Sequence, residues 1–344
     1  MPVHNFARPR GRVLELVIES EALRNNLLGD PPARTVAVYL PEGYDRSEAR
    51  YPVFVYLAAY TSGGLAQLGW KGFGESLPQR LDRLVAAGAM GPVIAVLPDC
   101  FTSLGGNQYV DSAAVGRWAR FLTEELLPRI DAGFRTIAGR EGRAVLGRSS
   151  GGYGALVHGM CYPQAWGAVA CHSGDVAFDL VYRPELPRAL DTIARHGGSI
   201  PAFLEAVARA PKLRGEHWQA LLVLGLAASF DPDPAAPFGI RLPVDPHTCA
   251  LIPARWERWL AHDPLRLLEQ SPCQQALRRL RGLWLDCGSR DQYAIHYGMR
   301  LLVRRLGALG IPHHYEEFDD DHSGIDYRLD RSLPFLYHTL TAQG

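Results

Sequence analysis

Ser149 is the residue whose type and spacing most clearly suggest chemistry. It stands in a pentapeptide, Gly147-Arg148-Ser149-Ser150-Gly151, that fits the pattern G-x-S-x-G between an apolar, strand-like stretch and a helix-like one. Such a sharp strand-to-helix turn exposes the serine hydroxyl, and glycines flank the serine because a Cβ has no room there. The adjacent Ser150 would need a glycine at the position of Arg148. The spacing therefore predicts Ser149 as a nucleophile.

A serine hydroxyl becomes strongly nucleophilic only when a base removes its proton, and in this kind of turn an acid and then a histidine follow the serine along the chain. Asp291 follows one apolar strand-like stretch and His322 follows the next. Because the carboxyl ends of parallel strands meet at one edge of a sheet, we expect both residues beside Ser149. Asp286 is the rival acid, but it lies within a strand and is expected to be structural.

Acyl transfer also needs N–H donors for the oxyanion that forms at the carbonyl. The backbone of Ser150, directly after the nucleophile, is the first expected donor. The second is expected from the loop 58–64, at Tyr60, with Ala59 as the alternative. Aromatic residues near these stretches are candidates for a substrate-binding pocket, with core packing as the competing interpretation: Trp70, Tyr109 and Tyr153.

The histidines and cysteines give no pattern typical of a metal site. His313 and His314 are adjacent on an expected strand and point to opposite faces, and His172 is expected to support the site or to pack in the core. The six cysteines show no C-x-x-C spacing, which indicates buried thiols in a reducing compartment rather than disulfides. We therefore expect no metal and no cofactor.

The composition excludes several classes of function. Lys and Arg together number 36, as do Asp and Glu, so no strong overall field favours nucleic acid or an anionic membrane. The most apolar run, 221–228, is far shorter than the roughly 20 residues that a membrane span needs, and favours a buried helix or a homodimer contact. No secretory signal is visible at the N-terminus, so a cytoplasmic location is expected.

The alternation of elements predicts an α/β protein with about eight strands. The first two strands are expected to form an antiparallel edge, and short apolar runs farther on are typical of parallel strands that are buried on both faces. Helices follow from the third strand onward, including one predicted over 111–130. This order predicts a mostly parallel sheet with helices on both faces.

One long segment interrupts this alternation. Residues 175–280 contain several helical patterns and a proline-rich loop, whereas residues 1–174 and 281–344 carry the strand pattern. We expect the segment 175–280 to form a helical cap over the carboxyl edge of the sheet. A lateral, solvated elaboration is the alternative.

Several stretches together resemble the esterase-D and enterochelin-esterase-like family of serine α/β-hydrolases. They cover nearly the whole chain apart from the insertion: residues 34–45, 57–64, 109–112, 124–128 and 171–174, the serine turn with its Gly-Gly-Tyr-Gly continuation, and Asp321-His322-Ser323-Gly324. The resemblance implies an α/β-hydrolase fold and a metal-independent esterase with Ser149, Asp291 and His322 as a catalytic triad. Many members carry His-Gly where this chain has Ala58-Ala59, which bears on the position of the second oxyanion donor.

The expected function is hydrolysis of a small-molecule carboxylic ester through an acyl-enzyme. Two alternatives stay open. An acyltransferase would use an alcohol in place of water in the second step, and a non-catalytic binding protein would keep the fold without turnover.

Overall fold

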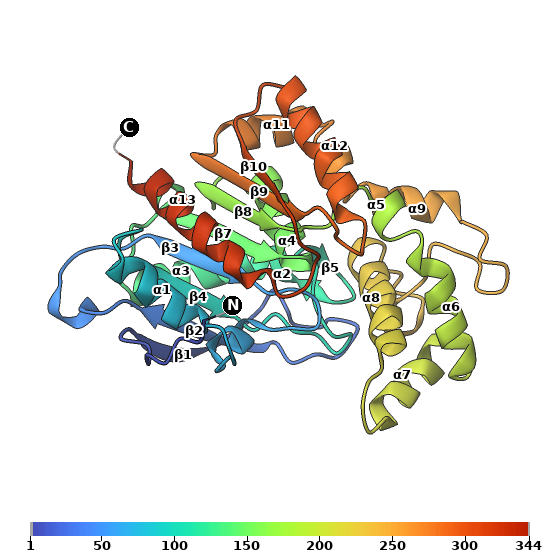
Figure 1. The fold of residues 1–344 in the computed structure, drawn as a ribbon. Helices are drawn as coiled ribbons and strands as arrows, with labels where there is room; N and C mark the ends of the chain where they lie inside the picture. The colour runs from blue at the N-terminus through green and yellow to red at the C-terminus, as the bar shows by residue number, and fades with distance from the viewer. Residues whose placement is uncertain (1–2, 343–344) are drawn as a thin grey trace.

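The computed structural model describes residues 3–342 and is built around one eight-stranded sheet, in the order β1-β2-β4-β3-β7-β8-β9-β10 (Figure 1). β1 pairs antiparallel with β2 and β2 with β4, and every later pair is parallel. The predicted mostly parallel sheet with an antiparallel edge is confirmed. Its strands are β1 Arg12–Glu19, β2 Ala33–Leu40, β3 Val53–Leu57, β4 Ile94–Pro98, β7 Arg143–Arg148, β8 Ala168–His172, β9 Gly282–Gly288 and β10 His314–Phe318.

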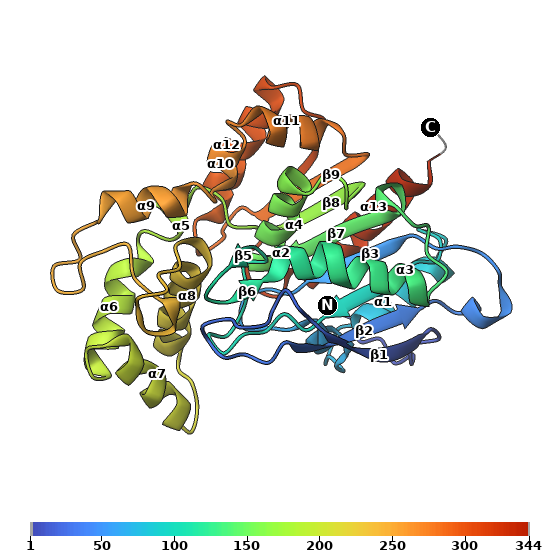
Figure 2. The same cartoon turned by 180° about the vertical axis from the view of Figure 1, so that it is seen from behind.

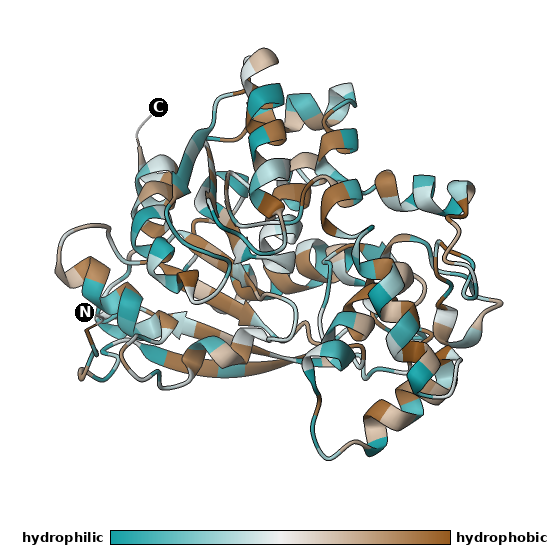
Figure 3. Ribbon diagram, turned by 45° about the vertical axis from the view of Figure 1, so that its right-hand side comes forward, coloured by the Kyte–Doolittle hydropathy of each residue, from teal (hydrophilic) through white to brown (hydrophobic). Residues whose placement is uncertain are grey.

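The central strands are buried on both faces. Every residue of β3, β4 and β8 is buried, whereas the edge strands β1 and β10 are partly exposed. This explains why the central strands read as continuous apolar runs rather than as alternating patterns. Figure 3 shows the hydrophobic positions concentrated in the interior of the sheet.

Helices cover both faces of the sheet, as Figures 1 and 2 show from opposite sides. One face packs on α1 and α13, and the other packs on the segment from α2 to α3, on α4 and on α12. A π-helical stretch, Phe121–Leu126, joins α2 to α3 in one continuous helix. The bounds are α1 Leu77–Ala86, α2 Trp118–Arg120, α3 Leu127–Gly133, α4 Ser150–Cys161, α12 Ile295–Ala308 and α13 Leu329–Thr341.

The helix predicted over 111–130 begins only at Trp118, so its first part was wrong. Asp111–Ser112 and Gly116–Arg117 instead form the short antiparallel strands β5 and β6. Gly116 adopts a φ of 103°, which a helix cannot accommodate. The Asp111 carboxylate then accepts the N–H of Arg120 (3.0 Å), one of the free donors at the start of the real helix.

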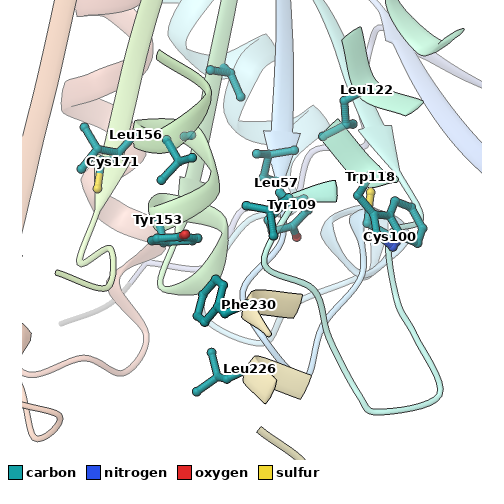
Figure 4. Close-up of a cluster of buried hydrophobic side chains, with 14 of the residues drawn as sticks. Leu57, Cys100, Tyr109, Trp118, Leu122, Tyr153, Leu156, Cys171, Leu226 and Phe230 are labelled. Atoms are coloured by element: carbon teal, nitrogen blue, oxygen red, sulfur yellow. The ribbon is translucent and has the colours of Figure 1, made fainter. Parts of the chain in front are cut away.

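Residues 175–280 form seven α-helices, of which α5 to α9 extend to one side of the sheet while α10 and α11 pack against α4 (Figures 1 and 2). They are α5 Phe178–Val181, α6 Glu185–Arg195, α7 Ile200–Arg209, α8 Gly215–Phe230, α9 Pro253–Leu260, α10 Pro264–Leu267 and α11 Ser271–Arg278. The apolar run 221–228 lies in α8 and is buried except for Leu222. In Figure 4 Tyr153 of α4 points toward Phe230 of α8, and their ring centroids are 5.8 Å apart. The insertion therefore shares one core with the sheet.

All six cysteines are free thiols, and four of them are buried. Cys249 is half-buried and Cys161 is exposed, so the expectation of buried thiols fails for these two. Across residues 3–342, none of the helices combines the length and the apolar character that a bilayer crossing requires.

Candidate active site

Ser149 lies at the junction of β7 and α4 in a strained backbone conformation, with φ 55° and ψ −124°. Its N–H donates to the His172 carbonyl of the neighbouring strand β8 (2.9 Å). The flanking glycines are required by close contacts: a Cβ on Gly151 would lie 2.0 Å from the Leu57 carbonyl oxygen, and one on Gly147 would lie 2.4 Å from the Gly151 carbonyl oxygen. Such strain persists where the surroundings hold it, and it is frequent at functional sites.

Asp291 and His322 come from the loops after β9 and β10, and the structure brings them together. His322 Nδ1 lies 2.7 Å from Asp291 Oδ2, and both residues are largely buried. The second carboxylate oxygen of Asp291 accepts the N–H of Tyr293 (2.9 Å), and Gln292 Oε1 accepts the N–H of His322 (3.0 Å). These bonds fix the carboxylate and the imidazole relative to each other.

The two loops meet closely because Gly288 ends β9. A Cβ at that position would lie 2.5 Å from the Asp320 carbonyl oxygen. The N–H of Ser289 donates to the Phe318 carbonyl (2.8 Å), and the N–H of Arg290 donates to the Asp320 carbonyl (3.0 Å). These two backbone hydrogen bonds therefore hold the loop after β10 against the loop after β9.

Ser149 and His322 line one cavity of about 630 Å³ at the carboxyl edge of the sheet. Their side chains form no hydrogen bond with each other in this structure. Catalytic hydrogen bonds of this kind are often long without a substrate and tighten when it binds. The arrangement places a strained serine and an oriented imidazole around the same space.

Tyr60 and Ser150, the predicted oxyanion donors, also line this cavity. Within residues 3–342 neither backbone N–H donates to another protein group. The Tyr60 side chain is anchored elsewhere: its hydroxyl donates to the Leu104 carbonyl (2.5 Å), and a Cβ on Gly106 would lie 2.2 Å from its ring. The side chain thus holds the loop while both N–H groups stay available to an acceptor.

The three aromatic residues predicted to bind substrate do not line the cavity. Tyr109 is 2% exposed and donates its hydroxyl to the Ala58 carbonyl (2.5 Å), so it supports the loop before Tyr60. Tyr153 is fully buried and donates to the His262 carbonyl (3.0 Å), tying α4 to the insertion. Trp70 is 77% exposed at the surface, beside His4.

Residues of the insertion supply much of the lining instead, and the sequence did not identify them individually. They are Asp175, Val181, Tyr182, Glu185, Gly215, Trp218, Gln219 and Leu222. Asp175 follows β8 as Asp291 follows β9, so the rule that found Asp291 could have found it. The residues of α6 and α8 carry no comparable signal, because their helical periodicity describes packing and not the cavity.

Among residues 3–342, no group of three or more His, Cys, Asp or Glu side chains is arranged to hold a metal ion. His313 and His314 bind separate partners, the Ile311 carbonyl and Glu316. The cavity lining includes a serine hydroxyl, an imidazole and carboxylates.

Comparison with known proteins gives one matching family model, described as putative esterase, over residues 31–330. An esterase of Mycobacterium tuberculosis is 34% identical over 141 residues, which are 40% of this chain and 28% of that protein. An endo-1,4-beta-xylanase/feruloyl esterase of Xylanibacter ruminicola is 30% identical over 162 residues, or 44% of this chain and 20% of that protein. The chain thus spans less than a third of the length of these relatives.

A solved structure of an S-formylglutathione hydrolase from Agrobacterium tumefaciens superposes with a TM-score of 0.60 at 18% identity, covering 98% of each chain. At this identity the likeness concerns the fold, which is the predicted α/β-hydrolase fold.

Proposed function

Because the chain belongs to the putative esterase family, we propose that it hydrolyses carboxylic esters and that Ser149 is its nucleophile. The observation that carries the proposal is the convergence of two features on one cavity. Ser149 sits there in a strained turn, and His322, hydrogen-bonded to Asp291, lines the same space. Neither feature alone would distinguish an active site from a tight turn or an ordinary ion pair.

In the first step His322 accepts the Ser149 proton while the Ser149 oxygen attacks the ester carbonyl. Asp291 accepts the Nδ1–H of His322, which leaves Nε2 as the base and stabilises the imidazolium that forms. The tetrahedral intermediate collapses to an acyl-enzyme, and His322 gives its proton to the departing alcohol. Water activated by the neutral imidazole then releases the acid and restores the serine.

The negative oxygen of each tetrahedral intermediate accepts hydrogen bonds from the N–H groups of Ser150 and Tyr60. Their support is that both line the cavity and neither donates elsewhere in the described chain. Fixed donors of this kind contribute strongly because they need no reorganisation as charge develops. The Ala58-Ala59 sequence in this loop leaves the backbone donor in place, because the contribution comes from N–H groups and not from side chains.

We further propose that residues 1–174 and 281–344 form the catalytic core and that 175–280 act as a cap. Support comes from Tyr182, Glu185, Trp218 and Leu222, which wall the cavity from the insertion. A cap of this kind would select substrates without taking part in the chemistry. The cytoplasmic location and a homodimer stay predictions.

The test is labelling with a fluorophosphonate, followed by intact-mass measurement. The wild type is expected to gain one adduct and Ser149→Ala none, while Ser271→Ala, a matched change on the exposed start of α11, keeps the adduct. A panel of nitrophenyl esters then measures turnover. With an added alcohol, the ratio of transesterified product to free acid shows whether the acyl group passes to the alcohol or to water. A folded wild type without an adduct, or an adduct that persists in Ser149→Ala, would contradict the proposal and favour a binding protein.

A further inference from the structure

Asp175 is a buried acid inside the proposed active site that the reaction above does not use. It lies in the loop after β8 and is 5% exposed, yet it lines the cavity with Ser149 and His322. The loop is strained: Ser173 has φ 43° and Ala177 has φ 64°, both in the left-handed region. It is also locked against the serine turn, because a Cβ on Gly174 would lie 2.7 Å from the Gly152 backbone. The fold thus holds this carboxylate in place at a cost.

The partners of Asp175 are neutral. Its Oδ2 accepts the hydroxyl of Tyr182 (2.8 Å), and the Ser150 hydroxyl lies beside the same carboxylate. No Lys, Arg or His forms an ion pair with it anywhere in residues 3–342. A carboxylate can accept about four donors, so these two hydroxyls leave part of its acceptor capacity unused. Burial raises the pKa of Asp175 to about 6, although the hydrogen bonds from Tyr182 and Ser150 and the nearby His322 imidazole oppose this rise.

A second carboxylate with unused acceptor capacity lines the same cavity. Glu185 of α6 accepts a hydrogen bond from Arg188 at Oε1 (3.1 Å), and its buried Oε2 has no hydrogen-bond partner among residues 3–342. Arg148, the basic residue in the lining, is directed to Asp326 (3.4 Å), which Lys71 also contacts (2.6 Å). The acids of the cavity are therefore not neutralised by its arginine.

Aromatic side chains complete the lining. Tyr182 and Trp218 come from the insertion, and Tyr293 comes from the loop that carries Asp291. Aromatic faces attract cations through the ring quadrupole, and a carboxylate without a counter-ion gains most from a charged donor. An anionic substrate group would meet two carboxylates, and a plain alkyl group would leave the Asp175 carboxylate without a charged partner.

We propose that Asp175, assisted by Glu185, forms a subsite for a positively charged nitrogen on the substrate ester, in either its acid or its alcohol part. This inference rests on the proposed esterase function, since the subsite lies beside Ser149. The nitrogen cation would donate to or lie against the free side of the Asp175 carboxylate. Asp175 then determines specificity and takes no part in bond making.

The test compares each cationic ester with its neutral isostere. Butyrylcholine and 3,3-dimethylbutyl butyrate differ only at the quaternary centre of the alcohol, and ethyl 6-aminohexanoate and ethyl heptanoate differ only at the end of the acid. We expect the wild type to favour the cationic member of at least one pair by about tenfold or more in kcat/KM, the size expected for one charge-assisted contact. The pair that shows the preference identifies which part of the ester carries the cation.

Asp175→Asn should reduce that preference about tenfold, Glu185→Gln should reduce it less, and Asp191→Asn on the exposed side of α6 should leave it unchanged. Calorimetry on Ser149→Ala with the same pairs measures binding apart from turnover, so the subsite is tested even if no ester is cleaved. Equal use and equal binding of both members by the wild type would overturn the subsite and leave the esterase proposal standing. A fluorophosphonate adduct on a wild type that shows no preference for either cationic ester would likewise overturn the subsite and leave the esterase proposal standing.

Discussion

The molecule contains two Asp–His pairs that look alike as hydrogen bonds and differ in everything around them. His322 and Asp291 are joined at 2.7 Å beside the cavity, and His172 and Asp286 are joined at 2.8 Å below the sheet edge. The second pair even has a serine: Ser332 Oγ lies 2.9 Å from His172 Nε2. By hydrogen-bond distances alone, Ser332, His172 and Asp286 would be chosen as a catalytic triad in preference to Ser149, His322 and Asp291.

Burial and partners separate the two pairs. Asp286, His172 and Ser332 are at most 2% exposed, and Asp286 also accepts Trp284 (3.1 Å) and Arg328 (3.1 Å). Every polar group of this set is satisfied, and no substrate can reach it. One ring nitrogen of His322 has no hydrogen-bond partner in the described part of the chain, and His322 lines a cavity with the strained Ser149. The difference teaches that access and unused hydrogen-bonding capacity, and not the chain of contacts, mark a site that reacts.

The buried set still bears on the cavity. The His172 carbonyl accepts the Ser149 N–H, so the strand that carries His172 also holds the serine turn. We interpret the buried His172–Asp286 pair as a structural support for the active-site residues, including the His322–Asp291 pair. Substitutions in the His322–Asp291 pair should then reduce activity, and substitutions in the His172–Asp286 pair should reduce stability.

The largest expected effect is on turnover, in Asp291→Asn. The amide cannot accept the Nδ1–H and position Nε2 as the base in the way the carboxylate does, so kcat should fall by about 10⁴-fold. Nitrophenyl ester hydrolysis measures the loss, and thermal unfolding measures the fold. Asp319→Asn in the neighbouring exposed loop is the matched control. A folded Asp291→Asn protein within tenfold of the wild type would remove Asp291 from the triad.

The next effect is on stability, in Asp286→Asn. The amide nitrogen would face the N–H groups of Trp284 or Arg328, and Arg328 would keep only Glu316 as a carboxylate partner, at a cost of about 2–3 kcal/mol. Urea unfolding should show this loss, while the fraction that stays folded keeps its fluorophosphonate adduct. An unchanged free energy of unfolding would contradict a structural role for Asp286. Loss of the adduct from folded Asp286→Asn protein, as in Ser149→Ala, would show that the buried pair takes part in catalysis.

The sequence predicted the sheet and the position of the serine well because both depend on local rules. Apolar runs that end in glycines and carboxylates fix where strands stop, and parallel strands bring those ends to one edge. Gly147 and Gly151 could be interpreted without any tertiary information, because only glycine fits beside such a turn. The helix predicted over 111–130 failed because its apolar positions kept helical spacing while Gly116 interrupted the backbone.

The lining of the cavity could not be predicted in the same way. Tyr109 and Tyr153 lie close to the serine turn in sequence and space, but their hydroxyls are used to hold the Ala58 loop and the insertion. The packing of the insertion on the core determines which face of α6 or α8 lines the cavity. The hydrophobic periodicity of the sequence does not predict that packing. Asp175 stands at a strand end and was open to prediction, whereas the absence of a cationic partner is visible only in three dimensions.

The smallest effect, and the finest test of the comparison, is Ser332→Ala. Ser332 lies inside α13, and within residues 3–342 its hydroxyl forms a hydrogen bond with the His172 ring and with no other side chain. Its removal leaves one buried ring nitrogen without a partner, which should cost about 1–2 kcal/mol in urea unfolding. The fluorophosphonate adduct should be kept, because a serine becomes a nucleophile only where a turn presents it to a cavity and a base can take its proton. Loss of the adduct from folded Ser332→Ala protein would mean that the buried set reaches the chemistry, and the separation between the two pairs would fail.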